Sequence, residues 1–181
     1  RFYMKLVKYF SCLILLFLFN LTTYSQTERT PTDNCDAQGW CWGNDPEATQ
    51  DNLAYFSDQY DFKEYQLAIE PLEWLLKNAP KLHKNLYIKA EKIYKESLKR
   101  EEDTTKIRVL EDKLLALYQR RITYFGEETK VLQKKGKVAY TILKNRENGV
   151  NDEKIYALYR QIFELNGNKT YKSNLLFLTK S

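Results

Sequence analysis

The sequence predicts an all-α fold in which antiparallel helix hairpins stack on one another. Only six glycines and four prolines interrupt the 181 residues, which is too few for the many turns of an all-β fold. Apolar residues recur at steps of three to five from residue 45 onwards, as expected for helices with one buried face. Trp74, Tyr118 and Tyr159 are 44 and 41 residues apart, which indicates a repeat of helical-solenoid length.

The first 25 residues have the pattern of a secretory signal peptide. Lys5 and Lys8 precede an apolar run over residues 12–19, and small and polar residues follow up to Ser25. That is the order a signal peptide requires, and the run is shorter than the ~20 apolar residues of a transmembrane helix. We expect cleavage after Ser25. The remaining chain would be periplasmic, secreted or associated with the outer membrane, without an integral membrane segment.

Removal of the leader brings the net charge close to zero. The chain has 29 basic and 24 acidic residues, and three of the basic ones but no acid lie in residues 1–25. That leaves 26 basic against 24 acidic residues. A chain so close to neutral lacks the broad basic surface on which nucleic-acid binding depends. We therefore expect no nucleic-acid partner.

Residues 26–44 are predicted to form a polar linker that contains a disulfide loop. The segment shows no helical periodicity, and Cys35 and Cys41 are separated by five residues of a turn-forming stretch. An oxidising compartment favours their pairing; the alternative is a pair of free thiols in a loose arm. The only histidine is His83, so we expect no zinc site, which needs three or four such ligands. His83 is expected to be a surface residue.

Seven helices are expected after the linker, over residues 46–60, 63–78, 81–100, 105–124, 128–146, 152–166 and from about 168 onwards. Asp45 and Pro46 are typical of a helix start, because the Asp side chain accepts from free N–H groups and Pro suits the first helical position. Thr104 is expected to cap the fourth helix. Gly126 is expected to end it, and Asn148-Gly149 and Asn166-Gly167 are expected to end the next two.

Some individual side chains are expected to point into the core. The apolar stripe of the second helix includes Leu67, and that of the sixth includes Phe163. Tyr87, Tyr94 and Tyr140 are expected to pack between helices, because a large aromatic ring is mostly buried in a helical core.

Two triplets share a spacing of four and then eight residues, namely Ala68, Leu72 and Pro80, and Ile155, Tyr159 and Gly167. At this spacing a small residue lets two helices approach, a large one fills the gap between hairpins, and Pro ends the helix. The pattern resembles the second helix of a tetratricopeptide repeat, and the chain as a whole resembles envelope tetratricopeptide-repeat proteins of the Bacteroidetes. Its period exceeds their usual ~34 residues, and the family's glycine in the first helix of each hairpin is absent.

The resemblance implies a right-handed superhelical solenoid of about three hairpins over residues 45–181. In such a solenoid the apolar run of residues 175–178 would lie on a helix without a partner. Either the native protein continues past residue 181, or this face docks on a partner or on a second copy; continuation is the reading we favour.

Lys130, Lys134 and Lys137 are spaced so that they share one face of the fifth helix. In this family that helix would line the concave groove, where a basic stripe could hold an acidic peptide or a C-terminal carboxylate. The alternative is a solvated face. No nucleophile motif, glycine-rich phosphate loop or cluster of metal ligands occurs in the sequence, so we expect no enzyme and no cofactor.

The expected function is a non-catalytic scaffold of the bacterial cell envelope that binds a protein or peptide. The alternative is a structural spacer or an oligomerisation segment of a larger envelope protein.

Overall fold

The computed structural model describes residues 33–144 and 152–178, and within these ranges the chain is helical without strands. The helices are α2 (Pro46–Asp61), α3 (Ile69–Asn78), α4 (Lys84–Arg100), α5 (Thr104–Phe125), α6 (Glu128–Lys144), α7 (Asp152–Asn166), the 3-10 turn η1 (Gly167–Lys169) and α8 (Lys172–Leu178). The expected signal peptide and the expected stop at Asn148-Gly149 lie outside the described residues. Among the described residues, no helix combines the length and the apolar character needed to cross a membrane.

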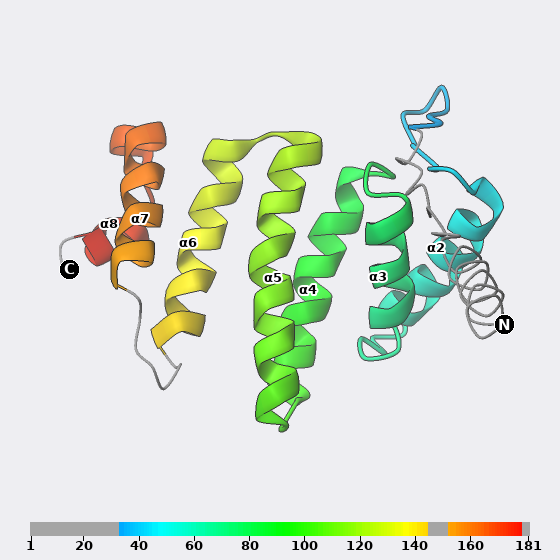
Figure 1. The fold of residues 1–181 in the computed structure, drawn as a ribbon, viewed down its shortest axis with the longest axis horizontal. Coiled ribbons are helices and arrows are strands. Elements are labelled where there is room, and N and C mark those ends of the chain that lie inside the picture. Colours follow the sequence, from blue (N-terminus) through cyan, green and yellow to red (C-terminus); the bar gives the residue numbers. More distant parts are fainter. Residues whose placement is uncertain (1–32, 145–151, 179–181) are drawn as a thin grey trace, which may run out of the picture. The chain divides into compact units, whose positions relative to one another are not determined.

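Each helix packs against the helix that follows it in the sequence, from α2 through to α8. From α2 to α7, successive helices alternate in direction (Figure 1). In addition, α6 contacts α8. The predicted all-α class is therefore confirmed.

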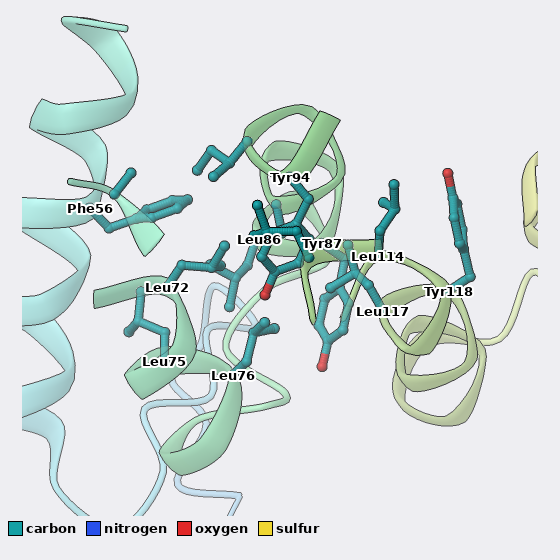
Figure 2. Close-up of a cluster of buried hydrophobic side chains, with 14 of the residues drawn as sticks. Phe56, Leu72, Leu75, Leu76, Leu86, Tyr87, Tyr94, Leu114, Leu117 and Tyr118 are labelled. Atoms are coloured by element: carbon teal, nitrogen blue, oxygen red, sulfur yellow. The ribbon is translucent and has the colours of Figure 1, made fainter. Parts of the chain in front are cut away.

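The core is built from one apolar stripe on each helix. Its main cluster joins α2 to α6 and includes Phe56, Leu72, Leu76, Tyr94 and Leu114 (Figure 2). A second cluster lies between α6 and α7 and contains Leu132, Ile155, Tyr159 and Ile162. Complete burial of one such side chain contributes about 1.5–3 kcal/mol, so the stacking of neighbouring helices supplies most of the stabilisation.

The three tyrosines expected between helices pack as predicted. Tyr87 and Tyr94 are buried in the main cluster, and the Tyr87 hydroxyl donates to the Pro80 carbonyl at 2.9 Å. Tyr140 is half-buried and packs against the second cluster. Phe163, by contrast, was expected inward and is 44% exposed, because it falls at the edge of the stripe that Tyr159 and Ile162 define on α7.

The second helix begins six residues later than the spacing predicts. Lys63 adopts a left-handed backbone conformation with φ of 63°, which ends the helical path after α2. The chain then forms turns up to Ala68, and α3 begins at Ile69. Within these turns Tyr65 is buried, whereas Leu67, expected to point inward, is 54% exposed. Because this segment forms turns, helical spacing does not predict which of its side chains are buried.

One helix cap and one helix start differ from the expectation. Asp103, and not Thr104, caps α5, since its carboxylate accepts from the N–H groups of Thr105 at 2.8 Å and Lys106 at 3.2 Å. A carboxylate is the stronger acceptor at the positive end of a helix, and the bonds to Lys106 and Thr105 lower the pKa of Asp103. The predicted third helix starts at Lys84 instead of residue 81, with His83 as its cap.

The two triplets of the repeat pattern occupy different helical positions. Ala68 immediately precedes α3 and acts as its cap residue, whereas Ile155 lies within the first turn of α7. Leu72 and Tyr159 are both buried, so the large residue has the same role in each. The two triplets therefore share their spacing but do not begin at the same position relative to the start of the helix.

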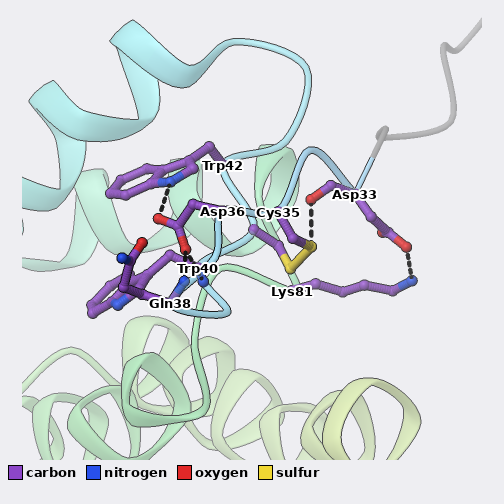
Figure 3. Close-up of a disulfide and its surroundings, with 8 residues drawn as sticks. Asp33, Cys35, Asp36, Gln38, Trp40, Trp42 and Lys81 are labelled. Carbon is purple, nitrogen blue, oxygen red and sulfur yellow. Dashed lines mark hydrogen bonds and ion pairs between the residues drawn. A yellow bond between two sulfur atoms is a disulfide. The ribbon is translucent and has the colours of Figure 1, made fainter.

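Residues 33–44 are folded onto the helices. A disulfide joins Cys35 to Cys41 (Figure 3). Inside this loop the Asp36 carboxylate accepts from the N–H groups of Trp40 at 2.9 Å and Gln38 at 3.0 Å, and from the indole of Trp42 at 2.9 Å. The backbone bond from Trp40 and the indole bond from Trp42 lower the pKa of Asp36. The loop is therefore an ordered unit.

Backbone and ring contacts attach this loop to the first helices. The Cys41 N–H donates to the Leu82 carbonyl at 3.1 Å, and the Thr49 hydroxyl of α2 donates to the Trp42 carbonyl at 2.8 Å. The Trp40 ring stacks on His83 with centroids 4.6 Å apart. The His83 ring is therefore held between Trp40 and the start of α4, where its Nδ1 accepts from the Asn85 N–H at 3.1 Å.

A buried guanidinium links the α5–α6 turn to α5 and α4. Arg121 is only 4% exposed, and it donates to Glu127 at 2.7 Å. The other oxygen of Glu127 lies 3.3 Å from Lys84 Nζ at the start of α4. Arg121 and, to a smaller extent, Lys84 lower the pKa of Glu127. This one carboxylate therefore compensates a charge that would otherwise be buried unpaired.

We predict that Glu127→Gln makes the free energy of unfolding less dependent on pH in the acidic range. The pKa of Glu127 is lower in the folded than in the unfolded chain, so its contribution is complete above the unfolded pKa and is lost as the pH falls through the folded pKa. Urea unfolding should show a clear deficit of the variant at neutral pH that shrinks below about pH 4.5. An equal deficit at pH 7 and pH 3 would contradict this role.

We also predict that Gly43→Ala destabilises the protein more than Gly39→Ala. Both glycines have positive φ, 73° and 81°, which costs an L-residue about 1–2 kcal/mol. A Cβ at Gly43 would also lie 2.5 Å from the Asn78 carbonyl oxygen, whereas one at Gly39 meets nothing within 4 Å. Thermal unfolding should separate the two by about 1–3 kcal/mol. Equal losses would mean that the loop is not seated on the end of α3.

Candidate functional site

A groove of about 580 Å³ lies between α4 and α6. Its apolar lining consists of Leu98, Leu114, Val138 and Ile142, and Tyr171 also lines it just before α8. The volume lies within the range of about 300–1,000 Å³ that is usual for ligand sites. The helices of two neighbouring hairpins therefore form a site that neither hairpin forms alone.

The α4 wall of the groove carries charges that are already paired. Lys95 Nζ lies 2.6 Å from Glu91, and Lys99 Nζ lies 2.7 Å from Glu96. The members of each pair are one helical turn apart, so the bonds form along the surface of α4. Exposed pairs of this kind contribute only about 0.3–0.5 kcal/mol each. Their effect here is to make the α4 wall nearly neutral.

The α6 wall carries two lysines without such partners. Lys134 and Lys137 line the groove, and neither takes part in an ion pair within residues 33–144 and 152–178. Lys130 is exposed and is not among the residues that line the groove. The structure therefore brings two of the three predicted lysines together and leaves the third outside.

Titratable groups of α4 and α5 interact with one another beside the groove. Burial and the nearby carboxylate of Glu91 raise the pKa of Tyr118, so its hydroxyl stays protonated at physiological pH. Glu91 itself lies against Lys95. Among the described residues, no three His, Cys, Asp or Glu side chains are placed to hold a metal ion. What the site offers is an apolar surface beside uncompensated positive charge.

A buried amide network fixes the end of the groove. Gln133 is 5% exposed, and its side-chain NH₂ donates to Asn166 at 2.9 Å and to the Lys169 carbonyl at 3.1 Å. Its side-chain oxygen accepts from the Tyr171 N–H. The Asn174 amide, fully buried in α8, donates to the Gln133 carbonyl at 3.1 Å. These bonds hold the η1–α8 turn, and with it Tyr171, against α6.

The sequence interpretation did not identify this network. Its one available signal is that Gln133 directly follows the buried pair Val131 and Leu132 in an otherwise amphipathic helix. Such a position is compatible with a solvated glutamine as well, because the partners lie more than 30 residues away in sequence. The contacts of α8 with α6 are what make Gln133 a buried hub.

We predict that Gln133→Leu lowers the free energy of unfolding by about 2 kcal/mol, because the Lys169 carbonyl and the Tyr171 N–H lose a buried partner. Gln161→Leu is the matched control, since Gln161 is exposed and its side chain bonds, among the described residues, only to Glu128 at 3.2 Å. Its effect should stay within about 0.5 kcal/mol. Urea titrations measure both. A loss as small as that of the control would show that the turn does not depend on Gln133.

Comparison with known proteins adds no further constraint. No protein-family model, no curated protein and no solved structure matches this chain. The resemblance to tetratricopeptide repeats therefore stays a prediction based on the sequence. The groove between α4 and α6, with its apolar floor and two uncompensated lysines, is the basis on which a function can be inferred.

Proposed function

We propose that this chain is a non-catalytic protein-interaction scaffold of the bacterial cell envelope that holds an acidic segment of a partner protein in the groove between α4 and α6. Its hairpins would stack as a right-handed solenoid of the tetratricopeptide type. The alternating direction of successive helices and the packing of each helix on the next support this arrangement.

The observation that carries the proposal is the unequal charge of the two groove walls. On α4 the two lysines that line the groove, Lys95 and Lys99, each pair with a glutamate of the same helix. On α6, Lys134 and Lys137 line the groove, and neither forms an ion pair with a carboxylate of the described residues. A partner that supplies carboxylates would complete these charges and gain in both specificity and association rate.

The apolar lining adds a second requirement for the partner. Leu98 and Val138 are half-buried and form a surface for aliphatic side chains, and the buried Leu114 and Ile142 complete the apolar lining. A segment that alternates acidic and aliphatic residues would satisfy both the floor and the α6 wall. An amphipathic helix laid along a groove is one common form of such recognition.

A spacer or oligomerisation segment is the second candidate, and one observation favours it. Tyr156 and Phe163 of α7 are each 44% exposed and, seven residues apart, they share one helix face. Two copies could associate through this face. Light scattering of the protein as a function of concentration separates the candidates, because the scaffold proposal does not need a dimer.

We predict that Lys134→Glu/Lys137→Glu weakens binding of an acidic peptide at least about tenfold, or ~1.4 kcal/mol. The probe is a fluorescein-labelled peptide of Glu and Leu in a helical pattern, about 14 residues or four turns long. Fluorescence anisotropy measures Kd. Added salt should weaken the complex, since exposed charges are screened beyond about 8–10 Å.

Two controls make this test specific. Lys130→Glu changes the same charge on the same helix outside the groove, and we expect less than about a twofold effect. A second peptide, with Lys in place of Glu and the same leucines, should not bind. The proposal fails if both peptides bind equally well, or if Lys130→Glu is as damaging as the double substitution.

A further inference from the structure

A second, smaller pocket lies on another part of α4. Its volume is about 160 Å³, and it is bounded by α2, by the beginning of α4 and by the disulfide loop. The apolar side chains that line it are Trp40, Leu53, Phe56, Leu82 and Leu86. None of the residues that line it also lines the groove between α4 and α6. It is therefore a separate site.

The volume of this pocket matches one six-membered ring. An apolar cavity of about 150 Å³ in a protein interior accommodates a benzene molecule, so about 160 Å³ leaves space for one ring. Trp40 is the partly exposed aromatic ring of the lining, whereas Phe56 is only 1% exposed. Offset or edge contacts between rings add about 0.5–1.5 kcal/mol beyond burial. An aromatic ring is therefore the best-fitting occupant.

The wall formed by Trp40 is positioned before any ligand arrives. Its ring stacks on His83 at 4.6 Å and on Trp42 at 5.8 Å. The disulfide between Cys35 and Cys41 closes the loop that carries it. A wall that is already ordered loses little conformational entropy when a ligand binds.

Lys89 gives the pocket a positive charge that no carboxylate balances. Its Nζ lies 5.9 Å from the ring centroid of Phe56 and 4.7 Å from that of Tyr60. Within the described residues no carboxylate pairs with it, and no Asp or Glu is among the residues that line the pocket. Ser57 and Asn85 add two neutral polar side chains to the lining. A ligand that brings a carboxylate next to its ring would complement Lys89.

We propose that this pocket binds an aromatic side chain of a partner protein that has an acidic residue beside it in sequence. The ring enters beside Trp40, and the neighbouring carboxylate faces Lys89. This site goes beyond the groove for acidic segments, because it selects one ring and uses different residues of α4.

The test is a heteronuclear NMR titration of the protein with the peptide acetyl-Gly-Phe-Asp-Gly-amide. We expect saturable shifts of the Trp40 indole N–H, which Trp40→Phe identifies, and of the Asn85 amide. The peptide with Ala in place of Phe should give no saturable shift. The peptide with Asn in place of Asp should bind about threefold more weakly, as expected for one exposed ion pair.

Two variants of the protein locate the site. Ser57→Leu fills the pocket from α2 with a good helix former and should abolish binding, while circular dichroism confirms the fold. Lys89→Gln should weaken binding about threefold and remove the preference for Asp over Asn. Lys92→Gln is the matched control, since Lys92 stands over Tyr60 and Tyr65 and does not line the pocket.

Three outcomes would overturn the proposal: no saturable shift, equal binding of the Phe and Ala peptides, or undiminished binding by Ser57→Leu. Lys134→Glu/Lys137→Glu should leave the tetrapeptide affinity unchanged. That comparison distinguishes a failure of this pocket from a failure of the groove between α4 and α6.

Discussion

Burial of α4 between α3 and α5 is the constraint on which the rest of the structure depends. Tyr94 of α4 donates to Glu73 of α3, and Lys113 of α5 lies 3.0 Å from the same carboxylate. Burial, together with Glu73, raises the pKa of Tyr94, so this hydroxyl remains a donor at physiological pH. Arg120 of α5 donates to the Leu76 carbonyl of α3. Polar bonds thus connect all three helices around an apolar core.

A helix held in this way presents different residues to its two candidate sites. The side chains of Leu86 and Lys89 line the smaller pocket beside the disulfide loop, whereas those of Lys95 and Leu98 line the groove shared with α6. Both sites include residues of α4, so neither site can form unless α4 is packed in the core. Both depend on the same core, so substitutions that test them must lie on the surface if loss of binding is to be separated from loss of the fold.

How much of this could be predicted from the sequence differs between helices and their junctions. Apolar periodicity and local signals sufficed for the helices, and Asp45 and Gly126 begin and end theirs as predicted. The junctions depended on contacts that spacing does not contain. Lys63 adopts a left-handed conformation although it is not a glycine, and the turns that follow expose Leu67. His83 became a helix cap and a stacking partner of Trp40, which is distant in sequence.

The candidate site shows the same limit in electrostatic terms. Spacing placed Lys130, Lys134 and Lys137 on one helix face, but the position of α4 decides which of them faces a groove. The α6 lysines that face the groove also stay uncompensated, because Glu91 and Glu96 of α4 pair with lysines of α4 and not with those of α6. An uncompensated charge beside an apolar surface is a property of two helices together. For this chain, the case for partner binding therefore depends on how α4 and α6 are placed on the two sides of the groove, and not on the composition of either helix.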